Sequence, residues 1–333
     1  MAELRVTTHS GDGMLVRVLR TFNALPPAAL SLLGFLAASC ATPPPVVEPP
    51  PVPPPVVVQP PPAPPPIPKI GLALGGGAAR GFAHIGVIKV LEAQGIVPDM
   101  IVGTSAGSVV GVLYANGYSG FDLQKIAFEL EESSVSDYTM LSRGFIKGEQ
   151  LQNFINKALK NRAIENLPKP FGAVAADLQT GESIVFRRGN AGMAVRASSS
   201  VPGVFQPVSI NNHEYVDGGL VSPVPVNATR NLGADIVIAV DISKKPSGAK
   251  TEGTFDILMQ TFTIMGKSIS GLETVGADVV IRPNTDMISA ADFESKHLAI
   301  LEGEKAAQAA VPQIRAQIQA WTDRQMEKRK QTP

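Results

Sequence analysis

The sequence feature that most constrains the fold is an apolar run that ends in a serine flanked by glycines. Residues 96–102 predict a buried strand, residues 103–107 read Gly-Thr-Ser-Ala-Gly, and a helical pattern follows at once. A strand, a sharp turn and a helix in this order are the context of the G-x-S-x-G nucleophile elbow. Gly103 and Gly107 would leave room for neighbouring backbone, and the Ser105 hydroxyl would stand beside the N–H groups of a helix start. A tight turn in which a small residue simply fits is the alternative.

Strands and helices alternate on both sides of this turn. Short apolar runs predict strands, and longer stretches with helical spacing, some of them closed by glycine, predict helices. The strand–helix–strand–helix order at the start predicts an α/β fold with a parallel sheet covered by helices. The predicted strands cover residues 69–74, 96–102, 173–176, 183–186, 208–210, 214–216, 235–240 and 279–282, and the predicted helices cover residues 82–94, 105–116, 121–132, 149–160 and 298–328.

Charge and cysteine content exclude several classes of function. The 333 residues carry no net charge, and no run of Lys or Arg suggests nucleic-acid binding. Cys40 is the single cysteine, so an intrachain disulfide is impossible and a cysteine-based metal site is not expected.

Residues 1–40 resemble a targeting segment. Arg17 and Arg20 precede an apolar run over residues 28–39, which is shorter than the roughly 20 residues that a membrane-spanning helix needs. A basic start followed by a short apolar core is typical of a signal peptide. Met14 stands just before the basic part and is a second candidate for the start of the chain.

Cys40 follows three small residues, as the lipidated cysteine of a bacterial lipobox does, although Ala37 stands where leucine is usual. We therefore expect a lipid on Cys40 that anchors the chain to a membrane of the bacterial cell envelope, on the periplasmic side of the outer membrane. Cleavage near Ser39 with secretion, or a retained anchor, is the alternative. Residues 41–68 are rich in proline, which prevents helix and sheet formation and predicts an extended linker. The folded domain is expected over residues 69–333.

A glycine-rich loop follows the first predicted strand. Residues 75–81 read Gly-Gly-Gly-Ala-Ala-Arg-Gly, which matches neither the dinucleotide motif G-x-G-x-x-G nor the phosphate loop G-x-x-x-x-G-K-[ST]. Unhindered backbone N–H groups beside the cation of Arg80 would suit an oxyanion or a phosphate group. A tight turn packed against the sheet is the alternative.

Few residues are candidates for the base that would activate Ser105. An α/β-hydrolase takes a histidine from the chain after the serine, and only His213 and His297 lie there. His213 falls in a predicted polar turn, and His297 precedes a predicted helix without a glycine or loop signal. His84 lies among the packing residues of the first predicted helix. A Ser-His-Asp triad is therefore poorly supported.

Asp217 is the better candidate. It ends a predicted strand, and Gly218 and Gly219 leave space beside its carboxylate. An exposed aspartate has a pKa of about 3.9 and is a weak base, so burial in an apolar site would have to raise that pKa. An ordinary turn aspartate is the alternative.

Four blocks of this sequence resemble, in the same order, those of the patatin-like phospholipases. They are the glycine-rich loop with Arg80, the turn at Ser105, residues 199–207 (Ser-Ser-Val-Pro-Gly-Val-Phe-Gln-Pro) and the Asp-Gly-Gly motif at 217–219. The resemblance extends over residues 70–284. Two alanines, rather than one residue, separate the glycine triplet from Arg80, which resembles the bacterial subgroup akin to neuropathy target esterase.

This resemblance implies a three-layer patatin-like fold, with a mostly parallel central sheet and helices on both of its faces. It implies that Ser105 is the nucleophile and that Asp217 is its partner in a Ser-Asp dyad. Acyl esters of lipids, phospholipids included, are the expected substrates, and neither a cofactor nor a metal is expected. The residues that the resemblance places around the oxyanion hole are Gly75, Gly76, Gly77 and Arg80.

Two other classes of function stay open at this point. One is a carboxylesterase with a Ser-His-Asp triad, which would make His213 or His297 essential. The other is a tethered envelope protein that keeps the fold without catalysis. Such a protein should have lost a motif residue, yet every expected side chain is present.

Overall fold

The computed structural model describes residues 64–129, 138–141, 144–246 and 252–331. The predicted signal peptide, Cys40 and the linker up to residue 63 lie outside the described residues. None of the helices within the described ranges is long and apolar enough to cross a membrane.

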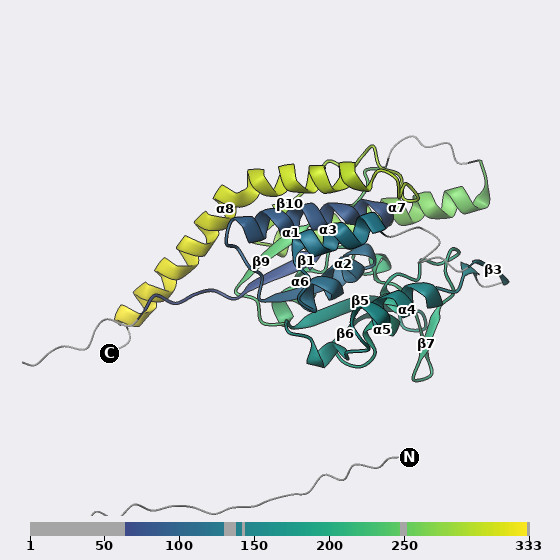
Figure 1. The fold of residues 1–333 in the computed structure, drawn as a ribbon, viewed down its shortest axis with the longest axis horizontal. Coiled ribbons are helices and arrows are strands. Elements are labelled where there is room, and N and C mark those ends of the chain that lie inside the picture. The colour runs from purple at the N-terminus through teal and green to yellow at the C-terminus, as the bar shows by residue number, and fades with distance from the viewer. Residues whose placement is uncertain (1–63, 130–137, 142–143, 247–251, 332–333) are drawn as a thin grey trace, which may run out of the picture. The chain divides into compact units, whose positions relative to one another are not determined.

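An eight-stranded sheet forms the middle of the domain (Figure 1), in the order β10-β9-β1-β2-β5-β8-β7, with β6 paired to β5. The first five strands in this order run parallel to one another, whereas β6 and β8 run antiparallel to β5, and β7 antiparallel to β8. The strands are β1 (Ile70–Leu74), β2 (Met100–Thr104), β5 (Phe171–Asp177), β6 (Ser183–Phe186), β7 (Val208–Ile210), β8 (His213–Asp217), β9 (Ile236–Val240) and β10 (Val279–Ile281). A separate hairpin consists of β3 (Tyr138–Leu141) and β4 (Gly144–Ile146).

The helices cover the sheet on both sides. They are α1 (Ala83–Ala93), α2 (Ala106–Ala115), α3 (Gly120–Glu129), α4 (Glu149–Ala158), α5 (Ala191–Ser198), α6 (Val226–Asn231), α7 (Thr254–Glu273) and α8 (Lys296–Gln331). Short 3-10 turns are η1 (Ala78–Phe82), η3 (Ile164–Asn166), η4 (Gly218–Leu220) and η5 (Thr274–Gly276).

Alternating side chains of the central strands point to two different apolar layers, as the pleat of a strand requires. Leu72 and Leu74 of β1 are buried in the larger core, which α1, α2 and α8 also supply. Ala73, between them, faces a smaller core that includes Val226 of α6 and Val237 of β9. Because both faces are buried, the central strands read as continuous apolar runs, which is typical of parallel strands.

Helices α1 and α8 lie side by side over one face of the sheet (Figure 1). Two glycines allow this close approach. A methyl group on Gly303 would lie 2.0 Å from the carbonyl oxygen of Ala83, and one on Gly86 would lie 1.9 Å from that of Ile300. The end of α8 also contacts the start of the described chain, because Arg329 donates a hydrogen bond to the Pro64 carbonyl at 3.0 Å.

The α/β fold class and the sheet with helices on both faces are confirmed. The second strand differs from its predicted range, since it spans Met100–Thr104 instead of residues 96–102. Pro98 has no N–H to give to a ladder. Asp99 donates its N–H to the Ile70 carbonyl at 2.7 Å, so pairing with the first strand begins only beyond the proline.

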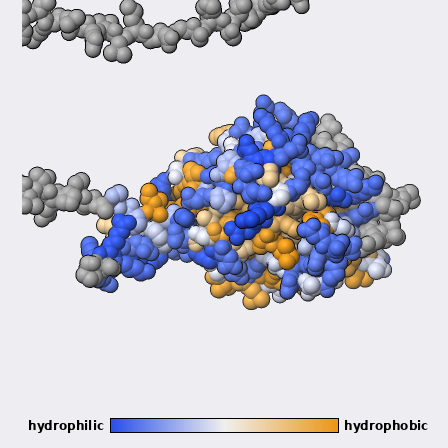
Figure 2. Space-filling model, turned by 90° about the horizontal axis from the view of Figure 1, so that it is seen from below, coloured by the Kyte–Doolittle hydropathy of each residue, from blue (hydrophilic) through white to orange (hydrophobic). Residues whose placement is uncertain are grey.

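The surface of the domain is not uniformly polar. On the face that Figure 2 draws, hydrophobic residues gather near the middle and along the lower edge of the folded part, between hydrophilic stretches. Among the described residues, the helix with the most exposed large apolar side chains is α7. The exposed large apolar side chains of α7 are Phe255, Ile257, Leu258, Ile264, Met265 and Leu272.

Candidate active site

Ser105 stands between the end of β2 and the start of α2 in a strained turn. Its backbone angles are φ 53° and ψ −124°, a conformation that a residue with a side chain rarely adopts and that costs about 1–3 kcal/mol. The flanking glycines make the turn possible. A methyl group on Gly103 would lie 2.3 Å from the Gly107 carbonyl oxygen, and one on Gly107 would lie 2.1 Å from the Leu74 carbonyl oxygen. The turn therefore has the geometry of a nucleophile elbow.

Serines at the end of α5 and directly after it hold this turn in place. The Ser105 N–H donates to Ser198 Oγ at 2.9 Å, and Ser198 Oγ donates to the Val174 carbonyl at 2.5 Å. Two residues further on, the Ser200 carbonyl accepts the N–H of Asp217 at 2.9 Å. The block around Ser198 and Ser200 thus fixes the backbones of both predicted dyad residues, a role that the sequence did not reveal.

Asp217 ends β8, opposite Ala175 of β5, and is only 6% exposed. Its Oδ1 accepts the Gly219 N–H at 2.7 Å. Gly218 must be glycine for the chain to pass this point, because a methyl group there would lie 2.2 Å from the Val174 carbonyl oxygen.

The electrostatic environment of Asp217 suits a base. Burial raises its pKa from 3.8 to about 6, although the Ser105 hydroxyl and the Gly219 N–H favour the charged form. Among the described residues, Asp217 Oδ2 is buried without a partner within hydrogen-bond geometry. The contact between the Ser105 hydroxyl and this carboxylate is therefore looser than a formed hydrogen bond, as is common in enzymes without bound substrate.

The glycine-rich loop lies directly over the nucleophile. A methyl group on Gly76 would lie 3.3 Å from Ser105 Cβ. The N–H groups of Gly75 and Gly76 are already used, since they donate to the carbonyls of Val240 at 3.0 Å and Pro223 at 2.9 Å. These two glycines therefore shape the loop, and the expectation that their N–H groups face an oxyanion is corrected.

The backbone N–H groups that remain available for an oxyanion belong to the next two residues of the loop. Within the described part of the chain, the N–H groups of Gly77 and Ala78 form no hydrogen bond. Both residues line the cavity that contains Ser105. Arg80 helps to hold the loop in place, because its buried side chain donates a hydrogen bond from Nε to the Ile242 carbonyl at 3.0 Å.

Of the three histidines with described side chains, His84 and His213 contact other groups, and His297, near the start of α8, is exposed. His84 is fully buried, contacts the Gly75 carbonyl through Nε2 at 2.8 Å, and burial lowers its pKa to about 4. His213 Nδ1 lies 2.7 Å from Asp177 Oδ2. No histidine is among the described residues that line the two cavities beside Ser105. The arrangement gives no support to a Ser-His-Asp triad.

Two cavities meet at Ser105. One has a volume of about 310 Å³ and is lined by Asp217, the glycine-rich loop and residues of α7. The other has a volume of about 190 Å³. Its walls are almost entirely apolar and include Phe82, Val109, Leu151, Val201, Phe205 and Phe293.

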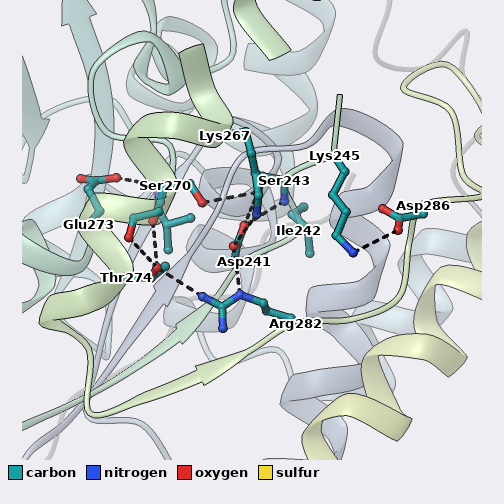
Figure 3. A network of polar contacts seen from close by, with 12 residues as sticks. Asp241, Ile242, Ser243, Lys245, Lys267, Ser270, Glu273, Thr274, Arg282 and Asp286 are labelled. Atoms are coloured by element: carbon teal, nitrogen blue, oxygen red, sulfur yellow. Dashed lines mark hydrogen bonds and ion pairs between the residues drawn. The ribbon is translucent and has the colours of Figure 1, made fainter. Parts of the chain in front are cut away.

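Helix α7 forms one wall of the larger cavity through Met259, Phe262 and Lys267. Below Lys267, a polar network joins α7 to the ends of β9 and β10, as Figure 3 shows. Asp241, which follows β9, lies at its centre. Among the described residues, no group of three or more His, Cys, Asp or Glu side chains could hold a metal ion.

Comparison with known proteins agrees with this geometry. Residues 72–230 match the family model described as patatin-like phospholipase. An uncharacterised NTE family protein of Mycobacterium tuberculosis is 34% identical over 217 residues, which is 63% of this chain and 59% of that protein. The patatin-like phospholipase domain-containing protein 6 of Mus musculus is 34% identical over 184 residues, 53% of this chain and 14% of that protein. The chain thus spans less than two thirds of the length of these relatives.

Among solved structures, VipD from Legionella pneumophila has a TM-score of 0.51 at 14% identity, over 73% of this chain and 66% of that one. That likeness concerns the fold. Together with the family match, it confirms the three-layer patatin fold. Residues 72–230 are therefore similar to patatin-like phospholipases, and NTE family proteins are among the relatives of this chain.

Proposed function

We propose that this protein is a serine hydrolase that cleaves acyl esters of lipids, phospholipids included, through a Ser105–Asp217 dyad. The observation that carries the proposal is a single cavity shared by a serine in a strained elbow and a buried aspartate with a pKa of about 6. At neutral pH such an aspartate is mostly ionised, yet it is basic enough to accept a proton in the transition state.

The reaction follows from the groups around Ser105. Ser105 Oγ attacks the ester carbonyl carbon while Asp217 accepts the hydroxyl proton. The N–H groups of Gly77 and Ala78 stabilise the oxyanion of the tetrahedral intermediate. Collapse of that intermediate expels the alcohol, which takes the proton from Asp217, and leaves an acyl-Ser105. Water then attacks the acyl group, gives its proton to Asp217, and Ser105 regains a proton as the acid leaves.

A lipid substrate is supported by the family match and by the apolar surfaces around the site. The smaller cavity at Ser105 has the apolar lining that an acyl chain needs. Helix α7 exposes Ile264 and Met265 to solvent, and Met265 also lines the larger cavity. Apolar side chains therefore continue from the surface into the site.

The proposal is tested by hydrolysis of phospholipids, lysophospholipids and short acyl esters by the full chain. We expect lipid acyl esters to be cleaved, and Ser105→Ala and Asp217→Asn to lower kcat by about 10³-fold or more with the fold intact. Near-normal activity of both variants would overturn the dyad. Loss of activity in His213→Ala or His297→Ala would favour the triad, and no hydrolysis of any ester by the folded wild type would favour a non-catalytic envelope protein.

We further propose that Cys40 is lipidated and that the proline-rich linker holds the domain near the membrane of the bacterial cell envelope that carries its substrate. The sequence around Cys40 supports this proposal. Growth with a fatty-acid probe tests it. The wild type should take up the label and Cys40→Ser should not. No label on the wild type, or equal label on both, would overturn it.

A further inference from the structure

The polar network under the larger cavity holds one lysine at the cavity wall. Lys267 of α7 places Nζ 3.5 Å from Asp241 Oδ2 and 3.3 Å from Ser243 Oγ. Arg282 places Nε 3.4 Å from the same Asp241 Oδ2. Figure 3 shows Lys267 and Arg282 pointing toward Asp241 from opposite sides.

Asp241 has two cationic partners in this network. Asp241 stays ionised, because hydrogen bonds from Ser243 and the charge of Lys267 outweigh the effect of burial and lower its pKa. One carboxylate therefore faces the two cations Lys267 and Arg282. The carboxylate fixes the position of the Lys267 ammonium group at the cavity wall.

More basic than acidic side chains line the larger cavity. Among the described residues that line it, the charged ones are Arg80, Lys244, Lys267 and Asp217. Asp217 is the proposed base, and Arg80 is buried and bonded to the Ile242 carbonyl. The Lys267 side chain is 33% exposed, and Asp241 and Ser243 take two of the three donors of its ammonium group, which leaves one for a ligand.

We propose that Lys267 binds the phosphate group of a phosphoester lipid while the acyl carbonyl of that lipid lies at Ser105. This inference rests on the proposed lipid hydrolase function. It adds that the cavity selects the substrate by its phosphate group. The lipid then lies across Ser105, with its acyl chain in the apolar cavity and its anionic head group in the charged one. A lysine held by a buried carboxylate is a preorganised point charge for phosphate.

Paired substrates with the same acyl chains test the inference. They are a short-chain phosphatidylglycerol and the uncharged diacylglycerol. We expect Lys267→Met to lower kcat/KM for the phosphatidylglycerol about 10- to 100-fold, mainly through KM, because a charged hydrogen bond is lost. The diacylglycerol should change by less than about threefold. Lys267→Arg, which keeps the charge, should recover most of the loss.

Lys245→Met is the matched control. Lys245 is exposed, lies 3.9 Å from Asp286 and does not line the cavity, so its loss removes the same charge from the chain without touching the site. We expect wild-type kinetics on both substrates. Asp241 keeps Arg282 and Ser243 as partners when Lys267 is replaced, so the fold should tolerate Lys267→Met.

An equal loss on both substrates, or no loss on the phosphatidylglycerol, would overturn the inference. Failure of the proposed function itself would look different, because the wild type would then cleave neither lipid. In that case, binding of a non-hydrolysable diether phosphatidylglycerol to the Ser105→Ala protein, with and without Lys267→Met, still tests whether Lys267 binds the phosphate group. Equal dissociation constants would end the proposal, and an increase of about tenfold in the Lys267→Met protein would support it.

Discussion

Replacing Asp217 with asparagine should reveal how much the ionised carboxylate in this site lowers the free energy of unfolding. In the wild type, Asp217 has a pKa of about 6, against an ordinary value of 3.8. One pKa unit corresponds to about 1.36 kcal/mol, so ionised Asp217 lowers the free energy of unfolding by about 3 kcal/mol above the higher pKa. Asparagine cannot ionise, and the variant avoids this penalty.

The sign of the pH dependence follows from proton uptake. Between the two pKa values the folded protein holds a proton on Asp217 that the unfolded chain has lost, so stability falls as the pH rises through this window. Below both values the group is neutral in both states and the penalty disappears. The stability of Asp217→Asn relative to the wild type should therefore increase by about 2 kcal/mol between pH 4 and pH 7.

Urea unfolding at several pH values measures this difference. All other titrating groups are shared by the two proteins and cancel, and so does any constant effect of the amide on packing. A stability difference between Asp217→Asn and the wild type that does not change with pH would refute the argument that burial raises this pKa.

Three further predictions concern rate and packing. The kcat/KM for an acyl ester should rise with pH through about 6, as Asp217 loses its proton in the free enzyme, and a flat profile would contradict the assigned base. Ser198→Ala should lower kcat about 5- to 100-fold, because the Ser105 N–H loses its acceptor. Ser200→Ala should change kcat little, because the Ser200 hydroxyl donates only to the nearby Arg196 carbonyl. Gly303→Ala should lower the free energy of unfolding by at least about 1–3 kcal/mol, measured by thermal unfolding. Gly271→Ala, which has open space around it, should not lower it. Equal melting temperatures of the two variants would show that α1 and α8 are not closely packed.

The parts of the fold that the sequence predicts well are those with local signals. Continuous apolar runs mark β1 and β9, because strands buried on both faces need apolar residues throughout. Glycines at 103 and 107 mark the elbow, because backbone comes within 2.1–2.3 Å of where their side chains would be. These signals need no knowledge of the rest of the chain.

Helix α7 was not predicted, although it forms a wall of the site. Its sequence contains Gly266 and several Thr, Ser and Ile residues, which have weak helix propensity. Its apolar residues are largely exposed and give little of the one-sided pattern that marks a buried helix face. Tertiary contacts with η4 help to hold it in place, and these are absent from a local pattern.

The detail of the oxyanion hole also depended on long-range contacts. All three glycines of the loop looked equivalent in the sequence. The N–H groups of Gly75 and Gly76 are taken by carbonyls of Val240 and Pro223, which lie far along the chain. Only the folded arrangement leaves Gly77 and Ala78 as the proposed donors.

The most direct test of the account is the site of covalent labelling by a fluorophosphonate, read by peptide mass mapping of the full chain. The account predicts one adduct on Ser105, no adduct in Ser105→Ala, and much slower labelling of Asp217→Asn. A folded wild type that takes no label, or an adduct on another residue in a Ser105→Ala protein that still hydrolyses lipid esters, would contradict it.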